Sequence, residues 1–473
     1  MNLTVEDLLT IPHLQDDGVK ALNLARPFRA VSTDSRSLKR DDIFVAIQGV
    51  NFDGHKFIDD VAREGAAAAI VSQEWYAARK GKKCPLPVVI VENTLDAFGA
   101  LANVYRKKFD IPIIVIAGSN GKTTTKELVA HVLSGARGVL KTEANYNNQI
   151  GLPHMLLQLR DGHELAVLEI GTNHPGEIEW LCNVAEPTHA LVTNIGREHL
   201  EFFKDLKGVA QEERIALEYV LGRGGVAFVN YDDRYLRPVV KLAPERCVTF
   251  GAGAEEDGRF VYAQRLGFAK DGRLEMRVGC EGKSFKLRTH IVADYAPNLI
   301  AGAVAVGLHF HMRRAEIKAQ LETFRPHSKR LEVVKMQEGI TILNDAYNAN
   351  PDSMESAFRT MTEFPVDGRK FIVLGDMFEL GETSQKEHRA LGRRVAEFGF
   401  ENVLFTGKDM ELAWKSYNTA SGKTNGATTQ SYFESKEKLA ERLRDLLQPG
   451  DAVLIKGSRG MRMEEVIELI QRG

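Results

Sequence analysis

The sequence predicts an α/β protein of three domains with largely parallel sheets. Apolar runs of strand length alternate with helix-like runs through most of the chain, an order typical of parallel strands joined by helices. A chain of 473 residues is also too long for a single hydrophobic core. Its 44% apolar and 27% charged residues are the balance of a soluble globular protein.

The first predicted domain covers residues 1–109. It holds three short strand-like runs and ends in a helix-like run, which in order are DIFVAIQG, AAAAIVS, LPVVIVEN and DAFGALANVYRKKF. Pro112 then precedes a run typical of a buried strand, so we place the domain boundary just before it.

The second predicted domain covers residues 110–325. It begins with the strand-like runs IPIIVIAG, ELAVLEIGT and THALVTNIG. Near residues 258–291 the pattern changes, because RLEMRVGCEGKSFKLRTHI alternates around a Glu-Gly turn and predicts an antiparallel hairpin. The small-residue helix NLIAGAVAVGLHF closes the domain, and Pro326 lies near its end.

The third predicted domain, residues 326–473, repeats strand and helix. Its strand-like runs are GITILND, RKFIVLGD, ENVLFTG and GDAVLIKGS, each followed by a helical stretch. This order again predicts a parallel sheet.

Composition excludes several classes of protein. A net charge of -2 without a long basic run does not indicate nucleic-acid binding. The first residues, MNLTVEDLLTIPHL, have no basic start and no continuous apolar stretch, so we predict neither a signal peptide nor a membrane span. The four cysteines are scattered without metal-ligand spacing, and we expect the reduced thiols of a cytoplasmic protein.

The stretch AGSNGKTT predicts a phosphate-binding cradle between an apolar strand and a helix. Gly118 and Gly121 lack side chains, so backbone N–H groups can point at phosphate oxygens. Lys122 would reach the outer phosphates, and Thr123 would offer a hydroxyl to Mg²⁺. The predicted nucleotide-binding residues of this loop are Gly118, Ser119, Asn120, Gly121, Lys122, Thr123 and Thr124.

The common pattern G-x-x-x-x-G-K-[ST] is not fully met, because Ile116 stands where its first glycine belongs. The alternative is an ordinary junction of strand, turn and helix. The flanking apolar strand and helix favour the cradle, which predicts a nucleotide but does not define the reaction.

Two other strand ends carry polar residues suited to a metal ion. Glu169 ends the run LAVLE, and His199 follows another strand in TNIGREHLE. Ligands of open α/β sheets gather at the carboxyl ends of strands, so both are candidate metal ligands. A surface histidine, and a capping or salt-bridge glutamate, are the alternatives.

A polar loop, NDAYNANPDSM, follows a strand of the third domain. Arg330 precedes it in SKRLE, and KGSRG follows the last strand with Lys456 and Arg459. Basic residues beside strand ends favour anionic ligands. The alternative for the loop is turn chemistry, which we accept for Asn350-Pro351 taken alone.

Together these segments resemble the Mur ligases, ATP-dependent enzymes that build the peptide of bacterial cell-wall precursors. The motifs that carry the resemblance are GSNGKTTTKE, EIGTNHPGEI, TNIGREHLE, NDAYNANPDSM, GDMFELGE and KGSRGM, with STDSRSLKRDDIFVAIQGVNFDGHKFI near the start. The most specific of them are similar to the member that joins D-alanyl-D-alanine to UDP-N-acetylmuramoyl-tripeptide. The resemblance implies a UDP-sugar domain, a central P-loop ATPase domain with a mostly parallel sheet, and a Rossmann-like C-terminal domain.

The resemblance also implies roles for individual residues. It implies catalytic roles for Lys122, His199 and Arg330, with ATP and Mg²⁺ as cofactors. Asn298 would contact the adenine, although Asp294 and Tyr295 replace the histidine-asparagine pair that often precedes it. Further nucleotide contacts would come from Arg330 and Asp345, metal contacts from Thr123, Glu169, His199 and Glu213, and substrate contacts from Ser35, Arg36, Asn348, Asn350, Ser353 and Lys456.

Glu213 departs from the family pattern. Counted from the metal-site histidine, many Mur ligases have a lysine at this position. CO₂ converts that lysine to a carbamate, and the carbamate supports a second Mg²⁺. Glutamate already carries an anionic oxygen pair, so we predict that Glu213 replaces the carbamate and makes the enzyme independent of CO₂. The alternative is a solvated Glu-Glu-Arg turn on the surface.

Other functions remain open at this stage. A sibling Mur ligase and a folylpolyglutamate synthetase-like ligase would share the cradle, although the latter lacks the YNANP loop. A nucleotide switch without ligation would need base readout such as an N-K-x-D loop, which is not found. The sequence does not specify whether the tripeptide ends in lysine or diaminopimelate, nor the oligomeric state, for which a monomer is the working expectation.

Overall fold

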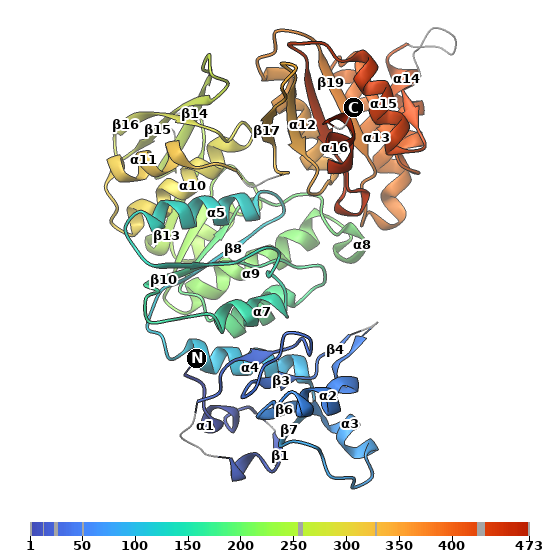
Figure 1. The fold of residues 1–473 in the computed structure, drawn as a ribbon. Coiled ribbons are helices and arrows are strands. Elements are labelled where there is room, and N and C mark those ends of the chain that lie inside the picture. Colours follow the sequence, from blue (N-terminus) through green and yellow to red (C-terminus); the bar gives the residue numbers. More distant parts are fainter. Residues whose placement is uncertain are drawn as a thin grey trace. The chain divides into compact units, whose positions relative to one another are not determined.

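The computed structural model describes residues 2–12, 14–22, 27–49, 52–253, 259–326, 329–422 and 431–471 (Figure 1). The chain folds into two compact units. The first consists of Met1–Val115, Arg137–Thr172 and Gly176–His189, and the second of Ile116–Ala136, Asn173–Pro175 and Ala190–Gly473. Each unit is a mixture of helices and mostly parallel strands, as the sequence predicts.

The first unit contains a five-stranded sheet in which β1 is antiparallel to β7 and the other pairings are parallel. In sheet order the strands are β1 (Gln15–Asp17), β7 (Val88–Val91), β6 (Ala68–Ser72), β3 (Ile43–Val45) and β2 (Val31–Ser32). A separate antiparallel pair consists of β4 (Gln48–Gly49) and β5 (Phe52–Asp53).

The helices of the first unit are α1 (Val5–Leu8), α2 (Ile58–Arg63), α3 (Gln73–Ala78), α4 (Thr94–Arg106), α6 (Gly151–Leu156) and α7 (Glu177–Ala185), with 3₁₀ turns η1 (Val19–Ala21) and η2 (Gly54–Phe57). Helices α4 and α7 approach each other closely at Gly99, where a Cβ atom would lie 2.7 Å from the ring of Trp180. The helix expected at the end of residues 1–109 therefore packs against a helix of the following segment. The domain boundaries near residues 109 and 325 remain predictions.

A nine-stranded sheet contains the strand that leads into the cradle. In sheet order its strands are β16 (Lys283–Thr289), β15 (Leu274–Cys280), β14 (Val261–Phe268), β13 (Cys247–Ala252), β12 (Val226–Asn230), β11 (His189–Val192), β8 (Ile113–Ala117), β10 (Leu165–Glu169) and β9 (Val139–Lys141). The predicted hairpin is confirmed, because β15 and β16 pair antiparallel across Glu281 and Gly282. Both turn residues have positive φ angles, 49° and 68°, as a two-residue type I′ turn requires.

The remaining helices around these strands in the second unit are α5 (Lys122–Ser134), α8 (Leu200–Phe203), α9 (Leu206–Gly222), α10 (Ala296–His309) and α11 (Arg314–Thr323), with 3₁₀ turns η3 (Arg237–Leu242) and η4 (Pro244–Arg246). The helix predicted to follow the cradle is confirmed as α5, and the helix predicted from NLIAGAVAVGLHF is confirmed as α10.

A six-stranded sheet forms the last part of the chain. In sheet order its strands are β17 (Glu332–Lys335), β18 (Thr341–Asp345), β22 (Ala452–Lys456), β19 (Lys370–Gly375), β20 (Asn402–Thr406) and β21 (Tyr432–Phe433). Only β17 among these runs antiparallel to its neighbour. Its helices, orange to red in Figure 1, are α12 (Pro351–Glu363), α13 (Ser384–Glu397), α14 (Met410–Ala420), α15 (Lys436–Leu446) and α16 (Glu464–Gln471), with turns η5 (Gly381–Thr383) and η6 (Arg459–Met461).

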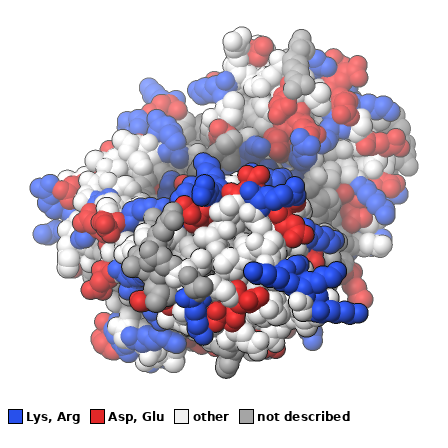
Figure 2. Space-filling model, turned by 60° about the horizontal axis from the view of Figure 1, so that its bottom comes forward, with Lys and Arg blue, Asp and Glu red and all other residues white. Residues whose placement is uncertain are grey.

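The surface carries both signs of charge. On the face shown in Figure 2, Lys and Arg side chains are interspersed with Asp and Glu side chains. Such a mixture produces no large field of one sign on that face. Among the described helices, none is long and apolar enough to cross a bilayer.

Candidate active site

The loop between β8 and α5 has the backbone conformation that its glycines permit. Gly118 and Gly121 have φ angles of 112° and 82°, in the region that favours glycine. A Cβ atom at Gly118 would lie 2.3 Å from the Thr193 hydroxyl, so only glycine fits there. The neighbouring strand end fixes the loop further, because Asn194 accepts from the Asn120 N–H and donates to the Asn120 carbonyl (3.1 and 2.9 Å).

The Gly118 N–H group does not face a phosphate as expected. It donates to Oε2 of Glu213 at 2.6 Å, and the Ser119 N–H donates to the Asn194 carbonyl at 2.9 Å. Helix α5, by contrast, begins without a capping side chain at Gly121. Because the first N–H groups of a helix have no partner within the helix, the first turn of α5, where Thr124 is buried, is the part of the cradle suited to an anion.

Three charged side chains gather behind the cradle. The Lys122 ammonium contacts Oε2 of Glu198 at 3.2 Å and the Ser119 carbonyl at 3.3 Å. Glu213 on α9 is completely buried beside them. Burial, and next the charge of Glu198, raise the pKa of Glu213 to about 8. The expectation of a solvated turn at Glu213 is therefore wrong, because the side chain belongs to the inside of the cradle.

The candidate metal ligands show features that fit a divalent cation. Glu169 is 3% exposed and its Oε2 atom has no hydrogen-bond partner, while Oε1 accepts from Asn147 at 2.9 Å. Oε1 of Glu213 is likewise buried without a partner. Such orphaned carboxylate oxygens are the hard ligands that Mg²⁺ prefers. Within the described residues, however, no three His, Cys, Asp or Glu side chains already form a metal-binding group.

His199 is held in a defined orientation. Its backbone has a positive φ of 46°, and its Nδ1 atom lies 3.1 Å from Oε2 of Glu379. The hydrogen bond from His199 lowers the pKa of Glu379. A carboxylate on one ring nitrogen fixes the imidazole and leaves the other nitrogen for a ligand, an arrangement common around metal-binding histidines.

A cavity of about 280 Å³ lies beside the cradle and is lined by Asn120, Asp232 and Asn298, among other residues. The Asn298 amide donates to Asp232 (2.8 Å) and to Asn230 (3.2 Å). Both of its N–H groups are thus engaged, which leaves its oxygen to accept a hydrogen bond. Adenine offers a donor amino group where guanine has an acceptor oxygen, so this orientation favours adenine.

We predict that Asn298→Ala raises the KM for ATP about tenfold, because one base contact of the usual strength is lost. The turnover number should change little, since the base is remote from the transferred phosphoryl group. Initial rates with ATP and GTP measure both effects. An unchanged KM for ATP, with GTP still rejected, would contradict the assignment.

Arg330 and Asp345 lie at the cradle end of the six-stranded sheet. The Arg330 guanidinium donates to the Thr123 hydroxyl at 2.9 Å and stacks on the Tyr347 ring at 3.8 Å. The structure thus brings Arg330 to the start of helix α5, next to the glycine loop. Asp345 accepts from the Leu331 N–H at 3.2 Å and contacts Lys456 at 2.5 Å, and burial raises its pKa.

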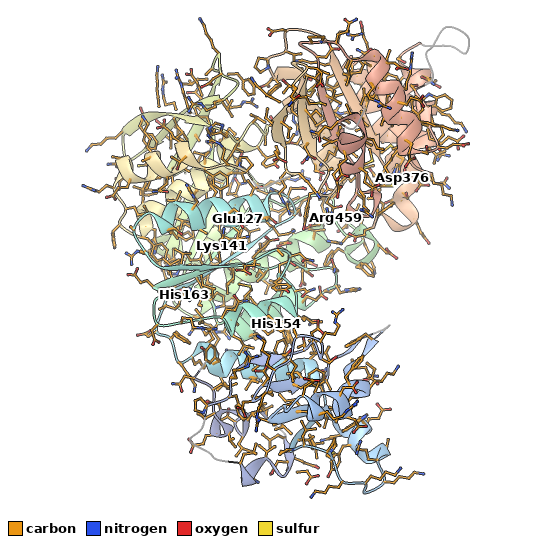
Figure 3. All side chains as sticks on the ribbon, in the orientation of Figure 1. Glu127, Lys141, His154, His163, Asp376 and Arg459 are labelled. Atoms are coloured by element: carbon orange, nitrogen blue, oxygen red, sulfur yellow. The ribbon has the colours of Figure 1, made fainter. Side chains whose placement is uncertain are left out.

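The structure does not support a substrate contact for Lys456. Its side chain is 2% exposed and donates to Asp345 and to the Asn348 carbonyl (2.9 Å). It therefore stabilises the polar loop from the buried side. Arg459, in the segment after β22, is exposed and pairs with Glu464 at 3.4 Å (Figure 3). Of the two predicted basic residues, only Arg459 is open to solvent.

Asn350 and Ser353 start helix α12. Each side chain bonds the backbone of the other, Asn350 accepting from the Ser353 N–H at 2.8 Å and Ser353 from the Asn350 N–H at 3.0 Å. Asn350 also donates to the Asn120 side chain at 3.0 Å. Both residues therefore act first as a helix cap. Asn348 accepts from the Arg459 N–H at 3.4 Å.

Ser35 and Arg36 lie in a turn of the first unit. Arg36 is exposed and pairs with Asp34 through two hydrogen bonds (2.9 and 2.7 Å), and this arginine lowers the pKa of Asp34 to about 2. The geometry is that of an Asp-Ser turn, and the assignment of these residues to the uridine diphosphate stays a prediction.

The sequence reasoning missed four charged residues near the cradle, namely Arg197, Glu198, Asp352 and Glu379. Arg197 and Glu198 stand inside the motif TNIGREHLE, directly before His199. The signal that could have revealed Arg197 and Glu198 is the pair of adjacent charged residues within a motif that follows a strand. For Asp352 and Glu379 the partners are distant in sequence, so no local pattern reveals them.

Comparisons with known proteins identify the family of the chain. Family models match in chain order at residues 27–106 (Mur ligase family, catalytic domain), 116–306 (Mur ligase middle domain) and 329–459 (Mur ligase, glutamate ligase domain). The UDP-N-acetylmuramoyl-tripeptide--D-alanyl-D-alanine ligase of Escherichia coli (strain K12) is 32% identical over 459 residues, 93% of each chain. The chain belongs to the Mur ligase family.

Other members of the Mur ligase family confirm the predicted architecture. The enzyme of the same name from Bacillus subtilis (strain 168) is 30% identical over 93% of this chain and 92% of its own. A MurF structure from Acinetobacter baumannii covers all of this chain and 99% of its own, with a TM-score of 0.86 and 27% identity. A Thermotoga maritima MurF ligase in complex with ADP has a TM-score of 0.79 and 27% identity, covering 94% of this chain and 97% of its own.

Proposed function

We propose that this Mur ligase is the ATP-dependent enzyme that joins D-alanyl-D-alanine to UDP-N-acetylmuramoyl-tripeptide in peptidoglycan precursor synthesis. The observation that carries the proposal is the hydrogen bond from Arg330 to the Thr123 hydroxyl, which brings the last sheet to the phosphate cradle. Relatives of that activity match over more than nine-tenths of both chains. The reaction serves cell-wall biogenesis, and through it cell shape and division.

The chemistry requires activation of a carboxylate. A carboxylate does not acylate an amine at neutral pH, because its oxygen is a poor leaving group. Transfer of the γ-phosphoryl group to the terminal carboxylate of the tripeptide gives an acyl phosphate. The amine of D-alanyl-D-alanine then attacks the acyl carbon, and the tetrahedral species collapses to amide and phosphate.

The chain's own residues would position and neutralise the reactants. ATP and the tripeptide carboxylate are both anions, so their approach requires positive charge. Lys122, the first turn of α5 and Arg330 supply that charge at one place. We propose that Mg²⁺ is held by ligands from Thr123, Glu169, His199 and Glu213, and when bound it would neutralise phosphate oxygens.

We also propose that the protein is cytoplasmic and monomeric. Cys84, Cys182, Cys247 and Cys280 are all free thiols, which fits the reducing cytoplasm where the nucleotide-linked substrate is made. The proposed assembly is a monomer.

Product analysis tests the proposal. UDP-linked tripeptides ending in lysine or in diaminopimelate are each incubated with ATP and D-alanyl-D-alanine, and mass spectrometry is expected to find the pentapeptide product. Phosphate release should require both tripeptide and dipeptide. Product with a single amino acid instead of the dipeptide would indicate a sibling ligase, and phosphate release without either substrate would indicate a nucleotide switch.

A further inference from the structure

A second cavity, of about 760 Å³, lies at the end of the six-stranded sheet opposite to Arg330 and Asp345. Strands β18 and β22 begin at this cavity, with Thr341 and Ala452 in its wall, and both end at the polar loop. A strand of five residues spans about 13 Å, so the second cavity is separate from the cradle. Its volume is in the range of small-molecule sites, and the proposed reaction gives it no role.

Basic side chains from several segments line the second cavity. They come from the turn between β14 and β15, from the segments that follow β16 and α11, and from the end of β17, and they are Lys270, Arg273, His290, Arg325 and Lys335. Arg273 pairs with Asp271 at 2.7 Å. Within the part of the chain that the structure describes, Lys270, Arg325 and Lys335 take part in no ion pair. Three cations of this cavity therefore lack a neutralising carboxylate.

Three acidic residues also line the second cavity, and two of them are already engaged. Asp271 is held in the ion pair just described. Glu332 accepts hydrogen bonds from the Lys329 N–H at 3.1 Å and from the Asn344 amide at 3.4 Å. Asp367 is the third. Four permanent cations thus face three carboxylates, and the cavity keeps an excess of positive charge.

The half-buried His290 ring reports the positive potential inside the second cavity. Burial, and next the charges of Arg325 and Arg273, lower the pKa of His290, and the charge of Asp271 offsets them only in part. The imidazole is therefore neutral at neutral pH and can donate one N–H group to a ligand. A neutral donor beside unpaired cations is a combination that binds carboxylate or phosphate groups.

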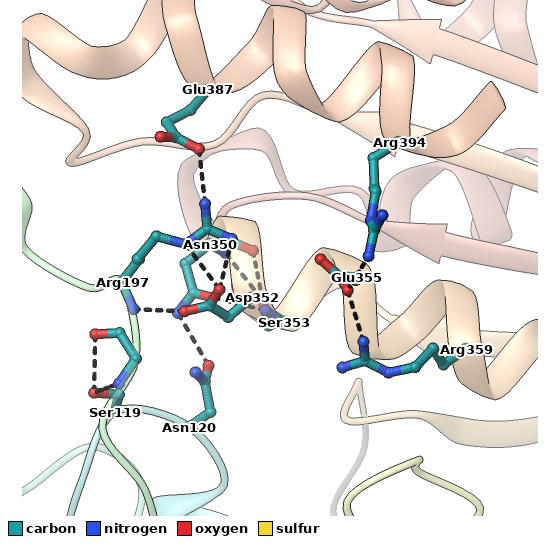
Figure 4. A network of polar contacts seen from close by, with 11 residues as sticks. Ser119, Asn120, Arg197, Asn350, Asp352, Ser353, Glu355, Arg359, Glu387 and Arg394 are labelled. Atoms are coloured by element: carbon teal, nitrogen blue, oxygen red, sulfur yellow. Dashed lines mark hydrogen bonds and ion pairs between the residues drawn. The ribbon is translucent and has the colours of Figure 1, made fainter. Parts of the chain in front are cut away.

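The arginines near the cradle are arranged differently (Figure 4). Arg197 pairs with Asp352 at 2.6 Å, and Arg359 pairs with Glu355 at 2.7 Å. Each of these guanidinium groups already has a carboxylate of the chain as its partner. The unpaired cations of the second cavity have none, so an anion from solution would relieve their mutual repulsion.

The second cavity also has apolar side chains in its wall. Val292 and Phe364 are 2% and 5% exposed, and Val333 and Met336 line the cavity beside them. A hydrated inorganic ion would gain nothing from these side chains. They favour an organic group attached to the anion, as in small-molecule sites that combine apolar walls with a few polar groups.

We propose that the second cavity binds a small organic anion, whose phosphate or carboxylate group is held by Arg325, His290 and the neighbouring unpaired cations. The apolar part of the ligand packs against Val292 and Phe364. The site lies outside the cradle, so the inference is independent of the proposed function.

The test follows the His290 ring by NMR in the full-length chain, with His290→Gln to identify its signals. Phenyl phosphate should shift these signals with a Kd of about 1 mM, a value typical of a few charged contacts. It should also raise the pKa of His290 towards the ordinary value, because the anion offsets the neighbouring cations. Phenol, which has the ring without the charge, should leave the signals unchanged. Benzoate is the carboxylate arm, and the tighter of the two anions identifies the charged group of the ligand.

Variants and competitors keep the test decisive. Arg325→Gln should weaken binding of phenyl phosphate about tenfold, because a charge-assisted hydrogen bond is lost. Lys286→Gln is the matched control, since it removes one positive charge from an exposed residue of β16 that does not line the cavity. Saturating ADP should leave the response of His290 intact. Equal affinity in Arg325→Gln and the unaltered chain, or loss of the response when ADP is added, would overturn the proposal. Inorganic phosphate binding as tightly as phenyl phosphate would overturn the assignment of an organic ligand.

Discussion

Replacing Lys122 by alanine is expected to lower the rate of ligation at least about 10²-fold, because one preorganised positive group is lost from the phosphoryl transfer. The variant is also expected to lose stability, because the Lys122 side chain is only 16% exposed and pairs with Glu198. The alanine variant would leave Glu198 and Glu213 buried without their cation. Steady-state rates and thermal unfolding measure the two effects separately.

A double variant separates chemistry from stability. In Lys122→Ala/Glu198→Gln one buried charge of each sign is removed, so the melting temperature should recover while the rate stays low. Lys318→Ala, from an exposed pair on α11, serves as the control for both measurements. Near-normal turnover by Lys122→Ala would refute the proposed role of the cradle.

The stability loss in Lys122→Ala should grow with pH. Lys122 lowers the pKa of Glu213, so its removal raises that pKa further above the present value of about 8. When a carboxyl group has a higher pKa in the folded state than in the unfolded chain, the folded state loses stability as the pH rises from the unfolded pKa towards the folded pKa. The variant should therefore differ most from the unaltered chain in alkaline buffer.

The sequence predicted the parts of the fold that depend on local pattern. Runs such as RKFIVLGD and GDAVLIKGS are continuous and apolar, and they became the central strands β19 and β22. The Glu-Gly turn likewise defined its hairpin. Strand β9 was missed because it has only three residues, and its pairing with β10 defines it rather than a pattern of its own.

The candidate site was predictable only where one segment carries the chemistry. The cradle is such a segment, and its glycines have the expected conformations. Lys456 was misjudged because strand order is invisible in the sequence. It ends β22, which lies between β18 and β19, so its side chain is enclosed by neighbours on both sides. The contact of Arg197 with Asp352 joins residues far apart in the chain and could not be foreseen.

Glu213→Gln is expected to raise the Mg²⁺ concentration needed for half-maximal activity about 10- to 100-fold, the usual cost of losing a group that supports a metal. The buried Glu213 has a pKa of about 8, so without a cation it is protonated at neutral pH. Glutamine has nearly the same shape as the protonated glutamate and is likewise uncharged. It can still accept the hydrogen bond from the Gly118 N–H. The variant should therefore melt at an unchanged temperature in the absence of Mg²⁺.

The pH dependence of the Mg²⁺ requirement tests whether Glu213 binds the cation. If a cation displaces its proton, the Mg²⁺ requirement of the unaltered chain falls as pH rises towards about 8, because metal binding then releases fewer protons. In Glu213→Gln that dependence should be absent. Activity of the unaltered chain in bicarbonate-free buffer should equal activity with bicarbonate added, since a glutamate needs no CO₂. A strong response to bicarbonate, or the same Mg²⁺ requirement in both proteins, would show that Glu213 supports only the backbone of the cradle.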